Sequence, residues 1–289
     1  MSGRMDAYAH CADLVRDADR DRFLAALFAP EPARHGLLAL YAFNVEVSRI
    51  RDRVSEPLPG EIRLQWWRDA VSAGEEGAGA AEDAAAHPVA AALLDTISRY
   101  RLPRQAFRDL LDARVFDLYD DVMPSLNDLE GYAGETSSAL IQLGCIVLAD
   151  GADPGTAEAA GHAGVAYALT GLLRALPFHA SRGQVYVPKD LLERHGGDAA
   201  DIIRGRATPG VRAALTELRA VTRRHLASAR ALLPSVPRAT LPAFLPVALV
   251  EPYLDRMDRP GYDPFRTPIE IPQWRRQFRL WRQARRGTI

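Results

Sequence analysis

The feature that most constrains the fold of this chain is its apolar periodicity, which is helical along almost its whole length. Apolar residues recur at three- and four-residue spacings, and no stretch alternates with the two-residue period of a half-buried strand. The predicted helices cover residues 33–54, 59–73, 88–99, 103–118, 126–148, 155–176, 208–232, 239–258 and 268–285. We therefore predict an all-α fold, with one domain over residues 1–289 because no repeat or second periodic region interrupts the pattern.

Two of these segments have the composition of buried helices. Residues 33–54 carry apolar side chains around most of the helical circumference. Residues 155–176 are rich in alanine and glycine, which lets neighbouring helices approach closely. We expect these two helices to face each other across the centre of the molecule.

Charge and cysteine content exclude several classes of protein. The formal net charge of -1 gives no reason to expect a nucleic-acid partner. The two cysteines, Cys11 and Cys145, are too few and too far apart for a disulfide framework or a cysteine zinc site. The sequence shows neither a signal peptide nor an apolar run of spanning length, so we expect a cytoplasmic protein.

Two separated motifs carry most of the information on function. The first runs from Leu-Tyr-Ala-Phe at residues 40–43 to Ser-Arg-Ile-Arg-Asp at residues 48–52. The second joins Leu-Leu-Arg at residues 172–174 to Ser-Arg-Gly-Gln-Val-Tyr-Val-Pro at residues 181–188. In order and separation they resemble the two signature regions of the squalene/phytoene synthase family. The resemblance covers most of the chain and implies an isoprenoid-synthase-type helical bundle around a central apolar cavity.

The resemblance implies a magnesium-dependent reaction, but the two motifs lack most of the aspartates that would bind the metal. Enzymes of the family condense two prenyl diphosphates, and Mg²⁺ neutralises the departing pyrophosphate as a Lewis acid. Mg²⁺ requires oxygen ligands, which facing pairs of aspartates supply. The corresponding positions are occupied by Ser48, Arg49 and Asp52 in the first motif and by Gly171, Ala175 and His179 in the second. A single carboxylate cannot assemble a magnesium cluster, so we expect neither a metal nor another cofactor.

The residues around these positions resemble a divergent, complex I assembly branch of the family. The resemblance is carried by residues 44–46, 65–67 and 173–182. It implies a non-catalytic protein that acts in respiratory complex I biogenesis or in prenyl-lipid binding. Two alternatives stay open. One is a prenyltransferase that binds Mg²⁺ through Glu46 and Asp52, and the other is an interaction scaffold whose cavity is filled by side chains.

The family resemblance also implies a ligand site. A prenyl lipid, a quinone or a prenyl diphosphate would be held in the cavity, with its head group bound through charge-assisted hydrogen bonds. The head-group residues would be Arg49, Asp52, Arg174, His179, Arg182 and Tyr186, and the cavity residues Tyr41, Phe43, Ser48, Gly171 and Ala175. If such a site persists, Arg49, Arg174 and Arg182 should converge on one mouth of an apolar pocket.

Other polar residues have plainer interpretations. Asp117, Asp120 and Asp121 have the spacing of a metal-binding box, but they precede Met123 and Pro124 at a predicted helix end. We interpret them as a solvated helix end. None of the 7 histidines lies at helical metal-binding spacing from another, which gives no reason to expect zinc.

The basic C-terminal tail, residues 272–289, predicts a membrane contact. Residues 274–286 contain 6 arginines and no acid, interleaved with Trp274, Phe278 and Trp281. Such a segment suits the interface of an anionic membrane. It predicts peripheral binding at the inner face of the cytoplasmic membrane, where a membrane-protein assembly partner would lie. The alternative is a terminal helix packed on the bundle with solvated arginines.

Overall fold

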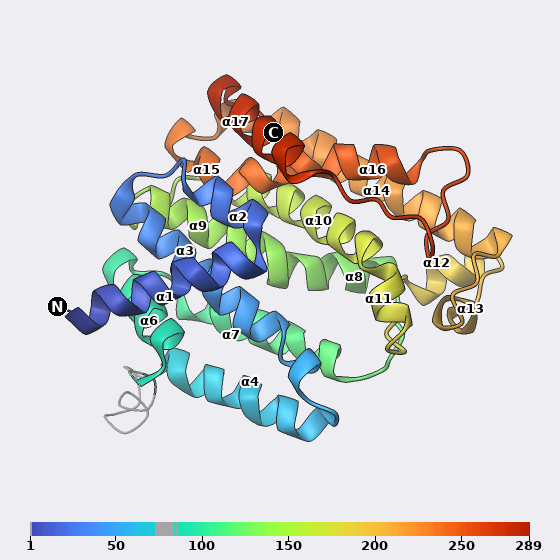
Figure 1. Ribbon diagram of the computed structural model, residues 1–289, viewed down its shortest axis with the longest axis horizontal. Helices are drawn as coiled ribbons and strands as arrows, with labels where there is room; N and C mark the ends of the chain where they lie inside the picture. The colour runs from blue at the N-terminus through green and yellow to red at the C-terminus, as the bar shows by residue number, and fades with distance from the viewer. Residues whose placement is uncertain (1, 73–83, 85) are drawn as a thin grey trace.

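The computed structural model describes residues 2–72, 84 and 86–289, and the all-α prediction is confirmed (Figure 1). Within these residues the only β-type pairing is an isolated bridge between Val122 and Val185. The first helices are α1 (Ser2–Ala18), α2 (Arg20–Ala26), α3 (Glu31–Ser48), α4 (Pro57–Ser72), α6 (Pro88–Tyr100) and α7 (Arg104–Ala113). They are followed by α8 (Leu126–Ala133), α9 (Ala139–Leu148), α10 (Ala157–Arg174), α11 (Leu176–Ala180), α12 (Lys189–Arg194) and α13 (Ala199–Ile203). The last are α14 (Pro209–Leu232), α15 (Leu241–Phe244), α16 (Val250–Met257) and α17 (Gln273–Arg286).

Helix α3 ends earlier than its apolar pattern predicts. Regular helix stops at Ser48, and the backbone N–H of Asp52 bonds to the carbonyl of Arg49 at 3.1 Å in a 3₁₀ turn, Arg51–Arg53. Such i→i+3 bonds commonly satisfy the groups that a helix end leaves unpaired. Asp52 of the first motif therefore lies on a tight turn beyond the helix.

Helix α9 joins the two hydrophobic clusters that make up the core. Its Leu140, Leu143 and Val147 belong to the cluster of the N-terminal half, whereas Ile141 and Cys145 belong to the cluster of the C-terminal half. Helices α3 and α10 both pack against α9. Helices α3 and α10, which we expected to face each other, thus both contact α9.

The expected helix over residues 126–148 is continuous but contains a π-helical turn, Gly134–Ser138, between α8 and α9. This turn packs closely on α10, where a Cβ added at Gly164 would lie 2.3 Å from the Cα of Ser138. The Ser138 hydroxyl donates to the carbonyl of Gly161 at 2.7 Å. The close approach of α10 to the π-helical turn therefore requires a glycine at position 164.

Helix α17 packs on the bundle with one face and exposes the other. Leu280 is buried, and Arg276 Nη1 binds both carboxylate oxygens of Asp21 in α2, at 2.7 and 2.8 Å. Trp274 and Phe278 are 63% and 56% exposed. In the described part of the chain, no helix has the length and apolar character needed to cross a bilayer.

Replacing Gly164 with alanine should destabilise the fold by about 1–3 kcal/mol, because the added methyl group collides with backbone atoms that cannot move away easily. The matched control is Gly171→Ala in the same helix, where an added Cβ meets no atom within 4 Å. That change should be neutral or stabilising by about 0.5–1 kcal/mol. Urea unfolding measures both, and equal effects of the two substitutions would refute the close approach.

Candidate functional site

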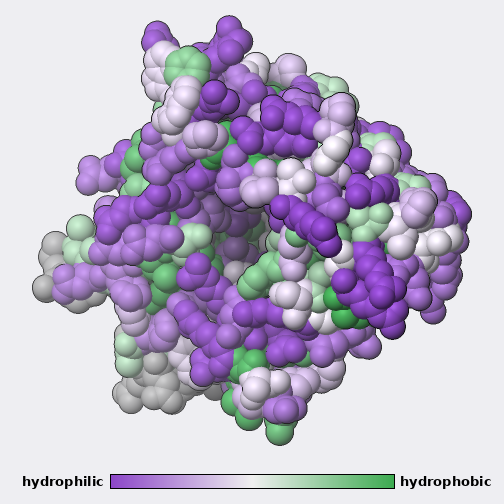
Figure 2. Space-filling view, turned by 45° about the vertical axis from the view of Figure 1, so that its right-hand side comes forward, coloured by the Kyte–Doolittle hydropathy of each residue, from purple (hydrophilic) through white to green (hydrophobic). Residues whose placement is uncertain are grey.

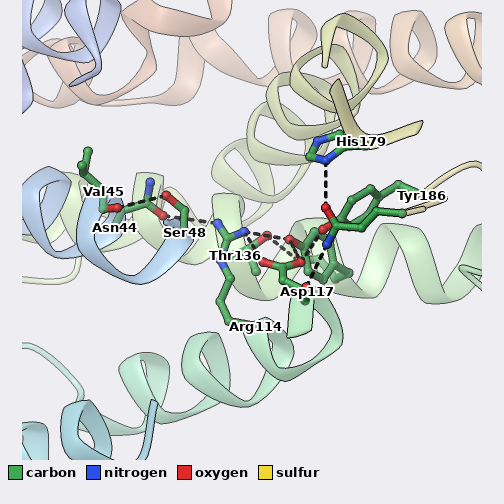
Figure 3. A network of polar contacts seen from close by, with 10 residues as sticks. Asn44, Val45, Ser48, Arg114, Asp117, Thr136, His179 and Tyr186 are labelled. Atoms are coloured by element: carbon green, nitrogen blue, oxygen red, sulfur yellow. Dashed lines mark hydrogen bonds and ion pairs between the residues drawn. The ribbon is translucent and has the colours of Figure 1, made fainter. Parts of the chain in front are cut away.

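A buried carboxylate, Asp117, lies at the centre of the polar network shown in Figure 3. Its Oδ1 accepts hydrogen bonds from the hydroxyls of Tyr132 and Tyr186, at 2.8 and 2.7 Å. Its Oδ2 accepts from Arg114 Nη1 at 3.0 Å. The interpretation of Asp117 as part of a solvated helix end is wrong, because the carboxylate is buried and accepts from Arg114, one turn away, and from two tyrosines that are distant in the chain.

The network extends from Asp117 towards both signature motifs. Gln184 Nε2 donates to the carbonyl of Asp117 at 2.8 Å, and Gln184 Oε1 lies 3.4 Å from His179 Nδ1. On the other side, Arg114 Nη2 donates to Asn44 Oδ1 of α3 at 3.5 Å. The 3₁₀ turn Arg114–Leu118 therefore connects α3 with the segment after α11.

Burial fixes the protonation of the aromatic groups in the network. It raises the pKa of the Tyr132 and Tyr186 phenols far above the usual range, so both remain hydrogen-bond donors. It lowers the pKa of His179, which favours the neutral imidazole. The arrangement suits a stable buried network, because the two phenols keep their protons and donate them to the Asp117 carboxylate in hydrogen bonds.

The carboxylates closest to the first motif are held by arginines. Asp52 forms an ion pair with Arg182 of the second motif, and each of the two side chains is 39% exposed. Glu46 binds Arg53 through both of its oxygens, at 2.7 and 3.3 Å. Asp120 pairs with Arg51 at 3.2 Å. Guanidinium groups thus occupy the positions beside these carboxylates where metal ions could otherwise bind.

No group of three or more His, Cys, Asp and Glu side chains that could hold a metal ion occurs among the residues that the structure describes. His162 and His225 do meet, with their Nδ1 atoms 3.0 Å apart, and His225 Nε2 lies 3.1 Å from Glu130. This contact joins α10 to α14, so spacing along one helix could not reveal it.

The three arginines expected at one mouth have different surroundings. Arg182 is paired with Asp52, whereas Arg174 lies 3.4 Å from Glu270, with its guanidinium carbon 3.8 Å from the centre of the Tyr253 ring. Arg49 is exposed. Arg174 and Arg182 thus have different partners, and the convergence of the three arginines on one mouth stays a prediction.

The cavity residues also divide into separate environments. Phe43 is fully buried, with its ring 5.1 Å from Trp67 and 5.6 Å from Phe107 in edge-on contacts, so it belongs to the packed core. Tyr41 is buried as well, under the guanidinium of Arg22 at 5.5 Å. We expected both side chains to line a cavity, but neighbouring side chains cover them.

The remaining positions near the motifs are more open. Ser48 and Ala175 are half-buried, and Gly171 is exposed. Figure 2, turned so that the side of α11–α13 comes forward, shows a face that is hollowed near its centre. By contrast, the cavity beside His179 and Tyr186 has a volume of only about 10 Å³. It has room for at most one water molecule.

A groove of about 860 Å³ lies next to this network, because Phe116 and Tyr132 both line it and the Phe116 ring contacts Tyr186. Its acidic lining residues are Asp112, Asp121, Asp128, Glu135, Glu193 and Asp198. Its apolar lining residues include Phe116, Met123 and Leu192. Sequence reasoning did not find this groove because its walls come from distant segments.

Asp117→Asn should destabilise the protein by about 3–5 kcal/mol, because it leaves the Arg114 guanidinium buried without its counter-charge. The matched control is Asp120→Asn, which removes a pair whose carboxylate side chain is 61% exposed. We expect this control to cost about 0–1 kcal/mol in urea unfolding. A similar loss for both variants would show that the Asp117 network does not hold the fold together.

Comparison with known proteins places the sequence in a family. Residues 15–282 match the model of squalene/phytoene synthase. A human protein named "NADH dehydrogenase (ubiquinone) complex I, assembly factor 6" is 30% identical over 96% of this chain and 82% of its own length. The rat protein of the same name is 32% identical over 96% of this chain and 84% of its own length. A 15-cis-phytoene synthase from Synechococcus elongatus is 24% identical, over 98% of this chain and 94% of the enzyme.

Solved structures agree on the fold. A dehydrosqualene synthase in complex with ligand has a TM-score of 0.81 at 17% identity, with 98% of this chain and 96% of that chain covered. A squalene synthase from Alicyclobacillus acidocaldarius has a TM-score of 0.74 at 23% identity, with 92% and 98% covered. The expected isoprenoid-synthase-type bundle is confirmed, and the chain belongs to the squalene/phytoene synthase family.

Proposed function

We propose that this chain is a non-catalytic member of the family that acts in the assembly of NADH dehydrogenase (ubiquinone), respiratory complex I. The observation that carries this proposal is the similarity, at about 30% identity over nearly the whole chain, to proteins named assembly factor 6 of this complex. The partner would be a subunit or an intermediate of the complex.

The ion pairs near the first motif support a role without prenyl transfer. A prenyltransferase would have to bind Mg²⁺ through Glu46 and Asp52, but these carboxylates pair with Arg53 and Arg182. Releasing them to a metal would leave two guanidinium groups beside the cation, which is electrostatically unfavourable. We therefore propose that the protein needs no metal or other cofactor.

The hollow in Figure 2 supports a second proposal, that the fold retains a prenyl lipid or quinone as a ligand. Arg49 is exposed, without an ion pair to any described residue, and Gly171 borders open space. These features suit an anionic or polar head group, whereas Arg174 is paired with Glu270.

We further propose that the protein lies in the cytoplasm and binds peripherally to the inner face of the cytoplasmic membrane through α17. Its exposed face carries Trp274, Phe278 and Trp281, which are 63%, 56% and 46% exposed. Tryptophan rings favour the level of the lipid head groups, where an apolar body and a polar edge are both accommodated.

Deleting the gene should reduce the amount of assembled complex I in membranes of the source cell, as measured by native gel electrophoresis and NADH–quinone activity. The intact chain should restore it, and so should Asp52→Asn, because this carboxylate is not needed as a metal ligand. Undiminished complex I after deletion would exclude the assembly role. Formation of squalene or phytoene from prenyl diphosphates and Mg²⁺, above a boiled control, would support the enzyme alternative.

Replacing Trp274, Phe278 and Trp281 together with serine should weaken binding to anionic vesicles without unfolding the protein, because these side chains are exposed. This change is preferable to truncation, which would also remove the buried Leu280 and the contact of Arg276 with Asp21. Sedimentation with vesicles measures the binding, and Leu58→Ser, at a side chain 66% exposed on α4, is the control. Unchanged binding by the triple variant would exclude α17 as the membrane contact.

A further inference from the structure

A groove of about 530 Å³ between α16 and α17 is lined by a concentration of arginines. They are Arg256, Arg259, Arg275, Arg279, Arg282 and Arg286. The acidic residue in the lining is Asp255, and it lies 3.4 Å from Arg223 outside the groove. The lining therefore carries a large excess of positive charge.

Within the described part of the chain none of the six arginines forms an ion pair, and the carboxylates of Asp255 and Glu251 act on Arg279 only at longer range. Arg279 Nε donates to the carbonyl of Ala248 at 2.6 Å, and Arg256 Nη1 donates to the carbonyl of Glu270 at 2.8 Å. By contrast, Arg276, also on α17, pairs with Asp21. Backbone carbonyls thus hold two of the six guanidinium groups in place, and they do not neutralise the positive charge.

Such a cluster is electrostatically costly unless an anion occupies it. Burial lowers the pKa of Arg279, and the neighbouring Arg230 and Arg282 lower it further. Like charges gathered against a low-dielectric surface repel each other more than they would in water. Phosphate suits this site, because the planar guanidinium donates two parallel hydrogen bonds to phosphate oxygens.

The groove continues into the aromatic face of α17. Phe278 belongs to the groove lining, and its ring stacks on Trp281 with centroids 5.8 Å apart. Trp281 and Trp274 are exposed on the same helix. A free phosphate or a soluble phosphopeptide would use the arginines alone, whereas a phospholipid brings phosphate and an apolar interface together.

We propose that the groove between α16 and α17 binds the headgroup of an anionic phospholipid that carries two phosphates. A headgroup with one phosphodiester supplies a single negative charge, whereas two linked phosphates can engage arginines of both helices at once. The proposal deepens the membrane attachment proposed for α17 and rests on it, but it adds selectivity for one lipid class, which aromatic insertion alone would not produce.

The test compares two vesicles of equal negative charge per unit of lipid. Both are phosphatidylcholine, one containing diphosphatidylglycerol, with two phosphates per headgroup, and the other containing phosphatidylglycerol, with one. The full chain should bind the first about tenfold more tightly in sedimentation assays, a difference that corresponds to about 1.4 kcal/mol. Arg259→Gln with Arg282→Gln should abolish this preference, because both side chains line the groove.

The matched control is the double variant Arg285→Gln with Arg224→Gln, which removes the same charge from outside the groove lining. Arg285 lies on α17, over the Trp281 ring at 5.1 Å. This variant should keep the preference for diphosphatidylglycerol. Urea unfolding midpoints confirm that all variants are folded, and Arg259→Gln alone replaces the groove double variant if that one is unstable.

The outcomes separate the two proposals. Equal binding of the unmodified chain to both vesicles would overturn the headgroup proposal and leave the membrane attachment standing. Binding to neither vesicle would overturn both. A loss of preference that is the same in the control and in the groove variant would show that only net charge matters, which also overturns a specific site.

Discussion

The buried ion pair between Asp117 and Arg114 is the interaction on which the arrangement of the two signature motifs depends. A carboxylate is costly to bury unless its charge and its hydrogen-bonding capacity are both satisfied. Here Arg114 supplies the charge, and Tyr132 and Tyr186 supply the remaining donors. Because Arg114 also reaches Asn44, one pair fixes α3, α8 and the segment after α11 relative to each other.

The same network explains which parts of the site the sequence could predict. Periodicity identified the helices because it reports which face is buried, and this property is local. The environment of Asp117 is not local, since its hydroxyl donors lie 15 and 69 residues away in the chain. The spacing of Asp117 and Asp121 resembles a metal box, whereas Asp117 in the fold accepts from an arginine and two tyrosines. Phe43 was misplaced for a similar reason, because Trp67 and Phe107 cover it from other helices.

Arginine side chains pair with the carboxylates that remain near the first motif. The pair between Asp52 and Arg182 is partly exposed, so it contributes little to stability, about 0–1 kcal/mol. Its consequence is instead chemical and geometric. It joins the two motifs directly, and it occupies the carboxylate that would otherwise be available to a cation. The fold thus brings the two motifs together through an ion pair between Asp52 and Arg182.

The C-terminal helix reconciles the two interpretations of its sequence. Leu280 and the contact of Arg276 with Asp21 hold one face of α17 on the bundle, as a terminal packing helix requires. The opposite face then presents Trp274, Phe278 and Trp281 from a helix that is already formed. A preformed surface avoids much of the entropy cost that a disordered tail would incur on binding. Packing and the proposed membrane contact are therefore compatible, because the buried face fixes the orientation of the exposed aromatic side chains.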